Sequence, residues 1–281
     1  MKEYDIVFSM GYACAVSEAL RDLGLQRESY PLDWVGAPSV LAGPRMIADD
    51  FADWFRREDL KLWDVRFVGG HVSRVYKNVH TGFGFPHEFT NAAPFEVAYE
   101  GVKAKYDRRI RRFHEKMLQS RRALAIYLEL PTRPRPPDGD LCEARRVLSM
   151  KYPDCEVDLL CFYEDDSCVA AEQAAHFDGI SVVKCHYRTM IGDKVHHVAD
   201  RRQLTEYLRN AAAVPHPVTE EESAAFRAVK RREYYASLGR NFAERWLYKK
   251  MTQWHRDLEA YLIGEKLLPG DHPTWFAGSG K

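Results

Sequence analysis

Residues 156–187 read EVDLLCFYEDDSCVAAEQAAHFDGISVVKCHY, and this stretch decides the fold class. It begins and ends with short apolar runs, at 156–163 and 180–187, which have the length and residue types of buried strands. Residues 165–177 between them have the composition of a helix, and we expect them to form one. A strand, a helix and a second strand in succession predict a right-handed crossover between parallel strands.

The same alternation extends toward the N-terminus. Residues 141–152 have helical spacing, 122–130 read as a strand, and a long amphipathic helix is predicted over 94–120. Residues 4–10 read as a first strand, and alternation around Gly69 and Gly70 predicts a hairpin. We therefore expect residues 1–214 to form an α/β domain with a mostly parallel sheet and flanking helices, a Rossmann-like arrangement of three layers.

Residues 215–281 are almost wholly helical in pattern, and we expect them to form a C-terminal helical extension. The segment PVTEEE at 217–222 has the form of a capping box at its start. Apolar residues such as Phe242, Trp246 and Leu258 recur at helical spacing. They either pack onto the domain or join copies of the chain into a homo-oligomer.

The charge balance excludes one large class of partners. Lys and Arg number 41 and Asp and Glu number 41, so the formal net charge is zero and no overall field holds a nucleic acid. No run reaches the about 18 consecutive apolar residues of a membrane helix, and no signal-peptide pattern is visible. We expect a cytoplasmic protein without a membrane partner.

The six cysteines show no disulfide framework, so we expect free thiols. No C-x-x-C pair occurs, and we expect no metal site. The chain also has neither a phosphate-binding loop nor the glycine pattern of dinucleotide binding, so we expect no cofactor.

Cys14 lies at the predicted boundary between the first strand and the helix that follows it. A helix start offers unpaired N–H groups and the positive end of a dipole, which favour a thiolate and can hold an oxyanion. Gly11 has no side chain to fill the space beside the sulfur, and Tyr12 offers a hydroxyl that can contact a substrate. Both are candidate substrate-binding residues. Because free cysteine is also among the most buried residue types, Cys14 is either a nucleophile or a packing residue.

A cysteine nucleophile needs an imidazole within hydrogen-bond reach, oriented by a third polar group. Among eleven histidines we favour His87, in GFGFPHEFTN at 82–91, which we expect in a loop after the hairpin. Its neighbours Glu88 and Asn91 are candidate substrate-binding residues.

A second loop carries two further candidates, Asp33 and Trp34, in SYPLDWV at 29–35. Asp33 either orients the histidine, binds substrate, or forms a turn by hydrogen bonding to its own backbone. Trp34 is a candidate substrate-binding residue.

Several motifs occur together in one order: DIVFSMGYACAVSEALRDLGL at 5–25, SYPLDW at 29–34, PHEF at 86–89 and VKAKYDRRIRRF at 102–113. With them the chain resembles a bacterial family of unknown function, known as papain-like cysteine peptidases. The resemblance covers about residues 4–130, with weaker agreement to about residue 210. It implies that Cys14 is the nucleophile, His87 its base and Asp33 a further polar residue of the site.

The resemblance also implies an alternative architecture. A papain-like α+β fold has its cysteine on a helix and its histidine on an antiparallel sheet, whereas the periodicity indicates parallel units. Three positions depart from the family's pattern, with Met10 in place of Leu, Leu32 in place of Phe and Glu88 in place of Asp.

Together these features predict a cysteine-dependent hydrolase or acyltransferase that acts on a small-molecule, peptide or glycan-linked substrate. The alternative is a non-hydrolytic sugar-phosphate or glycan-binding module of cell-surface polysaccharide biosynthesis, which binds an anion at the same helix start.

Overall fold

The computed structural model describes residues 2–12, 14–68, 71–90, 93–187, 189–191, 194–196 and 201–219, with isolated positions between 221 and 232. The helices are α1 (Cys14–Asp22), α2 (Ala42–Ala48), α3 (Phe95–Gln119), α4 (Asp138–Lys151) and α5 (Arg202–Ala211), with a 3₁₀ turn at Arg57–Asp59. The larger strands are β2 (Ile6–Ser9), β3 (Leu60–Val68), β4 (His71–Asn78), β5 (Gly84–Thr90), β6 (Arg122–Leu128), β7 (Glu156–Glu164), β8 (Glu172–Phe177) and β9 (Ile180–Cys185). Two small pairs complete the set, β1 (Lys2–Glu3) with β12 (Ala212–Ala213) and β10 (Thr189–Ile191) with β11 (Lys194–His196).

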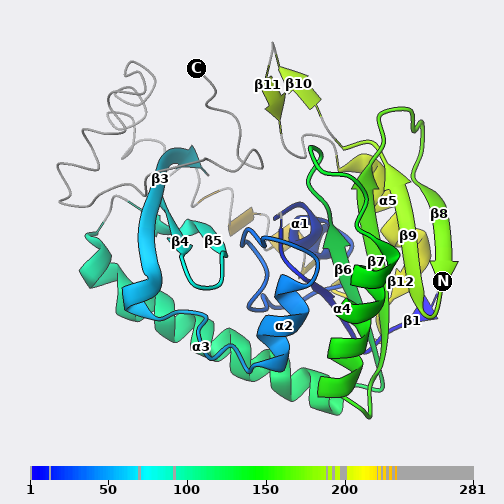
Figure 1. Cartoon of the computed structure of the whole chain (residues 1–281), viewed down its shortest axis with the longest axis horizontal. Coiled ribbons are helices and arrows are strands. Elements are labelled where there is room, and N and C mark those ends of the chain that lie inside the picture. Colours follow the sequence, from blue (N-terminus) through cyan, green and yellow to red (C-terminus); the bar gives the residue numbers. More distant parts are fainter. Residues whose placement is uncertain are drawn as a thin grey trace.

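The central sheet has five strands in the order β2-β6-β7-β9-β8 (Figure 1). The first four run parallel, with Ile6 opposite Ala123 and Leu159 opposite Ile180. These strands are buried on both faces, which is why their sequences are almost continuously apolar.

The predicted helix at 165–177 is wrong. Residues 172–177 form β8, which pairs antiparallel with β9 through a two-residue turn at Asp178 and Gly179. Both turn residues have positive φ, +43° and +69°, as the tight turn of a hairpin requires. The turn at Asp178 and Gly179 therefore produces a hairpin where the residue composition favoured a helix. Because β8 runs antiparallel to β9, the central sheet is mixed.

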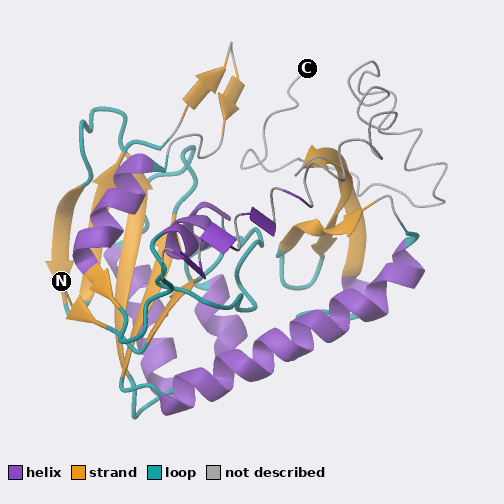
Figure 2. Ribbon diagram, turned by 180° about the vertical axis from the view of Figure 1, so that it is seen from behind, coloured by secondary structure: helices purple, strands orange, loops and turns teal. Residues whose placement is uncertain are grey.

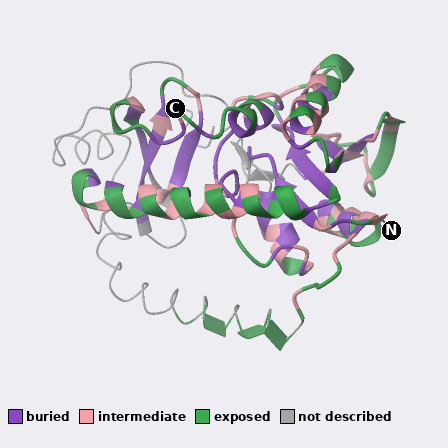
Figure 3. Ribbon diagram, turned by 90° about the horizontal axis from the view of Figure 1, so that it is seen from below, coloured by how far each residue is buried: buried purple, intermediate pink, exposed green. Residues whose placement is uncertain are grey.

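Helices cover both faces of the central sheet. On one face α1 and α5 pack against residues such as Val7 and Leu160, and on the other α3 and α4 pack against Phe8 and Leu159. The strands are buried while the outer side of α3 is exposed (Figure 3). The expected layers of helix, sheet and helix are thus present around this sheet.

The predicted hairpin is confirmed by β3 and β4, and β5 extends it to a separate three-stranded antiparallel sheet. Helix α3 runs from this sheet to the central one (Figures 1 and 2). Its Tyr106 ring lies 5.7 Å from Phe85 of β5, and its Phe113 ring lies 5.0 Å from Phe8 of β2. The α/β class is correct, but a mostly parallel Rossmann-like sheet describes only part of this fold.

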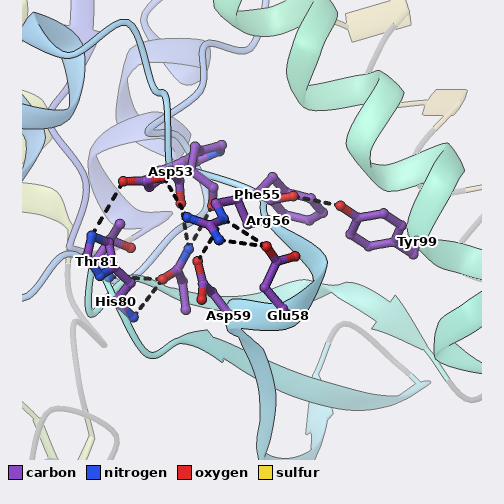
Figure 4. Close-up of polar contacts among 10 residues, drawn as sticks. Asp53, Phe55, Arg56, Glu58, Asp59, His80, Thr81 and Tyr99 are labelled. Carbon is purple, nitrogen blue, oxygen red and sulfur yellow. Dashed lines mark hydrogen bonds and ion pairs between the residues drawn. The ribbon is translucent and has the colours of Figure 1, made fainter.

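The hydroxyl of Tyr99 on α3 donates to the carbonyl of Phe55, at 2.7 Å, just before β3 (Figure 4). At the β4–β5 turn, Nε2 of His80 lies 3.4 Å from Oδ2 of Asp53, and Figure 4 labels both residues. The first contact joins α3 to the segment that leads into β3, and the second joins the β4–β5 turn to the same segment.

Most of the predicted extension at 215–281 lies outside the described residues. Its capping box is present, since the amide of Glu222 donates to Oγ1 of Thr219 and the amide of Thr219 donates to the Glu222 carboxylate. None of the helices in the described ranges has the length and apolar character that a membrane span requires.

Candidate active site

The turn between β2 and α1 places Cys14 at the first position of a helix. Gly11 has φ +81°, and its amide donates to Oγ of Ser9 at 3.1 Å. Tyr12 has φ +111°, which is rare for a residue with a large side chain. Two successive residues with positive φ turn the chain sharply at the carboxyl edge of the sheet, where α/β proteins commonly bind ligands.

Backbone hydrogen bonds join this turn to the chain segments of the other candidates. The Tyr12 amide donates to the Val35 carbonyl at 3.3 Å. Gly36 and Gly84 donate to each other's carbonyls, both at 2.9 Å. The start of α1, the loop at 30–37 and strand β5 are therefore neighbours, and they carry Cys14, Trp34 and His87 respectively.

One face of α1 packs on the loop at 30–37. Oγ of Ser17 donates to Oδ1 of Asp33 at 2.8 Å, and the guanidinium of Arg21 lies 4.7 Å from the centroid of the Trp34 ring. Ser17 and Arg21 stand three and seven residues after Cys14, so all three lie on the same side of the helix.

His87 lies within β5, not in the loop that we expected. The strand has a bulge there, because Pro86, His87 and Glu88 together stand opposite the single residue Val75 of β4. Bulges re-aim side chains and are common beside active sites. The side chain of Ser73 fills the bulge, with Oγ 2.7 Å from the Pro86 carbonyl and 3.1 Å from the Phe89 carbonyl.

Trp34 links the loop to the histidine. Its ring lies edge to face against the His87 ring, with centroids 6.2 Å apart. Its backbone has φ +66°, which a bulky residue adopts only when the surrounding structure enforces it. Trp34 therefore lies between Arg21 of α1 and His87 of β5.

The Cys14 thiol is half-buried, and burial raises its pKa. A backbone hydrogen bond and the positive charge of Arg201 act in the opposite direction, and they do not outweigh burial. The expected lowering of this pKa by the helix start is therefore wrong for the resting protein.

Asp33 is fully buried, and its carboxylate accepts three hydrogen bonds. Oδ1 accepts from Ser17, while Oδ2 accepts from Nε2 of Gln26 and from the Tyr30 amide, all at 2.8 Å. Burial raises the pKa of Asp33, and these hydrogen bonds oppose the rise. In this arrangement Asp33 fixes the loop to α1.

Glu88 has a buried carboxylate that faces α3. It accepts a hydrogen bond from the Tyr106 hydroxyl at 3.0 Å and forms ion pairs with Lys105 and Arg109. It therefore anchors β5 to α3. Asn91, the last candidate, lies outside the described residues.

Sequence reasoning missed three residues near the site: Arg21, Ser73 and Arg109. It also missed an imidazole–carboxylate pair at the carboxyl ends of β7 and β9, where Nδ1 of His186 lies 2.7 Å from Glu164. Only the position of His186 at the end of a predicted strand pointed to that pair. In the part of the chain that the structure describes, no group of three or more His, Cys, Asp or Glu side chains is arranged to hold a metal ion.

Comparison with known proteins gives no match to a solved structure. A protein of Acanthamoeba polyphaga mimivirus, named "Uncharacterized protein R408", is 29% identical over 128 residues. The match covers 41% of this chain and 57% of the length of the viral protein. Because this relative is viral, it gives no support to the bacterial origin that the resemblance implied. Residues 5–130, which include Cys14, Trp34 and His87, match the model of a family described as "putative papain-like cysteine peptidase (DUF1796)".

Proposed function

We propose that the protein is a cysteine-dependent hydrolase or acyltransferase, in which Cys14 attacks an acyl carbon and His87 acts as its base. The proposal is carried by the backbone hydrogen bonds that join the start of α1, the loop at 30–37 and β5. They make neighbours of two segments more than 70 residues apart in the chain, one with a thiol and one with an imidazole.

Two further observations support this assignment. The matched region at 5–130 contains both residues, and the family's description names cysteine peptidase chemistry. Cys14 begins a helix and His87 lies on an antiparallel sheet, as in the papain-like alternative described above. The local geometry thus agrees with that alternative even though the central sheet is largely parallel.

In the proposed reaction, His87 takes the proton of Cys14 as the sulfur–carbon bond forms. The carbonyl oxygen becomes an oxyanion, which the N–H groups of the first turn of α1 stabilise. When the carbonyl re-forms, the amine, hydroxyl or thiol leaving group departs with the proton from His87. Water or an acceptor amine or hydroxyl then attacks the thioester, again with His87 as base, and the thiol is restored.

The raised pKa of Cys14 sets the order of these steps in the proposal. Because burial raises the pKa of Cys14, the proposal has proton transfer to His87 accompany the attack. Asp33 acts in this proposal as a positioning residue, because it fixes Trp34 and the loop to α1.

The test is the site of acyl transfer. The protein is incubated with p-nitrophenyl acetate at pH 8, and peptides are mapped by mass spectrometry. We expect acetyl on Cys14 to form about a hundredfold faster than on the exposed Cys142, a difference typical of general-base assistance. Acetylation that follows exposure alone, with Cys142 the fastest, contradicts the proposal.

The competing function is the non-hydrolytic sugar-phosphate or glycan-binding module. One observation favours it, namely that burial raises the Cys14 pKa as expected of a packing residue. It predicts that no acyl group forms on Cys14 and that Cys14→Ser leaves ligand binding unchanged.

A further inference from the structure

Glu129 places a carboxylate at the carboxyl edge of the central sheet, directly after β6. Its backbone is fixed there, because its amide donates to the Phe162 carbonyl at 2.8 Å and its carbonyl accepts from the Tyr187 hydroxyl at 2.6 Å. The residue is only 5% exposed. A carboxylate buried to this extent is normally satisfied by a cation or by several hydrogen bonds, so the groups that meet its two oxygens decide its role.

The two oxygens of this carboxylate have different surroundings. Oε1 accepts from the Leu130 amide at 2.8 Å and from the Tyr127 hydroxyl at 3.3 Å, and Nη1 of Arg133 lies 4.0 Å from it. Oε2 accepts no hydrogen bond from any residue that the structure describes, and it belongs to the small part of the side chain that stays exposed. Glu129 therefore presents one free oxygen at the edge of the sheet.

The nearby arginine does not satisfy this oxygen. Nη1 of Arg133 donates to the Pro38 carbonyl at 2.7 Å, and its 4.0 Å separation from Oε1 is longer than a charge-assisted hydrogen bond. Burial raises the pKa of Glu129, and the Leu130 amide, Arg133 and the Tyr127 hydroxyl act against this rise without cancelling it. A ligand cation at Oε2 stabilises the buried charge more than a neutral donor does.

Glu129 and Cys14 follow neighbouring strands. The Met10 amide donates to the Ile126 carbonyl at 2.8 Å, so β2 and β6 are still paired where β2 ends. Paired strands lie about 4.8 Å apart, and a small molecule spans that distance. The carboxyl edge of parallel strands is also where such folds commonly bind ligands. The free oxygen of Glu129 therefore lies on the same edge of the sheet as the turn that leads to Cys14.

We propose that Oε2 of Glu129 binds an ammonium group of the substrate while Cys14 attacks the acyl carbon. This inference rests on the proposed function, and it narrows the substrate to a cationic acyl compound, an ester, thioester or amide that carries an amine. Glu129 binds and orients this substrate, and no covalent bond forms to its carboxylate. The hydrogen bonds to its backbone keep the free oxygen in one place.

The experiment compares two thiol reagents that differ in one group, 2-aminoethyl and 2-hydroxyethyl methanethiosulfonate. Each forms a mixed disulfide with a cysteine thiolate and releases methanesulfinate, and at pH 7 only the amino reagent carries a positive charge. Peptide mass mapping measures the rates at Cys14 and at the exposed Cys142. We expect the rate ratio of amino to hydroxy reagent to be about tenfold larger at Cys14 than at Cys142, the effect of one charge-assisted hydrogen bond.

Variants assign this preference to Glu129. Glu129→Gln keeps an oxygen for the Leu130 amide but has no charge, and it should lose the preference. Glu115→Gln, which removes an exposed carboxylate on α3, should keep all of it. Equal rate ratios at the two cysteines of the wild type, or a ratio at Cys14 that is unchanged in Glu129→Gln, overturn the inference. The hydroxy reagent should modify Cys14 at the same rate in the wild type and in both variants.

A second measurement does not depend on the reactivity of Cys14. The ¹³C resonance of the Glu129 carboxyl, identified by its absence from Glu129→Gln, is titrated with pH in propylammonium chloride and in potassium chloride at the same ionic strength. We expect a lower midpoint in the propylammonium salt, because a bound cation favours the ionised carboxyl. Equal midpoints overturn the cation site. If the midpoint is lower while Cys14 resists every reagent, the cation site stands and the proposed function fails.

Discussion

The rings of Trp34 and His87 meet edge to face, with centroids 6.2 Å apart and planes at 88°. The two residues come from a loop and a strand that share a pair of backbone hydrogen bonds at Gly36 and Gly84. Trp34 is in turn held under the guanidinium of Arg21. The orientation of the proposed base thus depends on a side chain that does not itself take part in the reaction.

Replacing Trp34 by Leu is expected to slow acetylation of Cys14 by about fivefold, since an aromatic pair contributes about 1 kcal/mol. Trp34→Phe keeps a ring against His87 and is expected to retain most of the rate. The measurement is the rate of acetylation by p-nitrophenyl acetate between pH 6 and 9. Equal acetylation rates for Trp34→Leu and the wild type would show that Trp34 does not position His87.

Asp33 is expected to matter through its hydrogen bonds more than through its charge. Asp33→Ala leaves the buried Gln26 amide and Tyr30 N–H without their acceptor and lowers the free energy of unfolding by about 3 kcal/mol. Asp33→Asn keeps an oxygen for these two donors and turns its amide toward Ser17, so its stability stays within about 1 kcal/mol of the wild type.

The free energy of unfolding of the wild type and that of Asp33→Asn should depend differently on pH, and the pKa shift of Asp33 gives the direction of the difference. Because burial raises the Asp33 pKa, the folded wild type favours the protonated carboxyl, and stability from this residue is lost as pH rises through its folded pKa. Urea unfolding from pH 4 to pH 8 should therefore show Asp33→Asn gaining on the wild type as pH increases. A gain as pH falls contradicts the direction of the shift.

Ser73 is expected to support the bulge that aims His87. Ser73→Ala removes the hydroxyl that bonds the carbonyls of Pro86 and Phe89, and it should lower the free energy of unfolding by about 1 to 2 kcal/mol. It should also slow acetylation of Cys14 while leaving the alkylation of Cys142 unchanged. The exposed Ser39, changed to Ala, is the matched control. Loss of stability without any change in acetylation limits Ser73 to a structural role.

Alkylation of Cys14 by iodoacetamide is expected to rise with pH to a midpoint above about 8.5, the ordinary value for a thiol, because burial raises the pKa. Arg201→Gln removes a positive charge that lowers this pKa, so its midpoint should move higher still. Mass mapping of alkylated peptides from pH 6 to 10 measures both. A plateau already reached at pH 7 indicates a preformed thiolate and contradicts this account.

Local sequence patterns predicted those elements whose signal lies within a few residues. The turn from β2 to α1, the long α3 and the buried strands β6, β7 and β9 all followed from apolar spacing. The error at 172–177 arose because helical composition was weighed without the Asp-Gly pair after it, although that pair sets a hairpin.

The candidate site was predictable only in part, for a physical reason. Cys14 and His87 stand in recognisable local contexts, a helix start and a glycine-rich stretch with a proline. By contrast, Arg21 and Ser73 acquire their roles from partners 13 residues away or more, Trp34 for the arginine and Pro86 for the serine. Such contacts depend on how loops and strands pack, which the spacing of residues along the chain does not determine.

The central claim is that Cys14 and His87 act as one unit, and a double-mutant cycle tests it most directly. The rapid release of p-nitrophenolate from p-nitrophenyl acetate is measured for the wild type, Cys14→Ala, His87→Ala and the double variant. When two residues act as one unit, removing either one costs as much as removing both. All three variants should therefore lose the burst to the same extent, within about twofold. A burst that survives in His87→Ala, or losses that multiply in the double variant, contradicts the account.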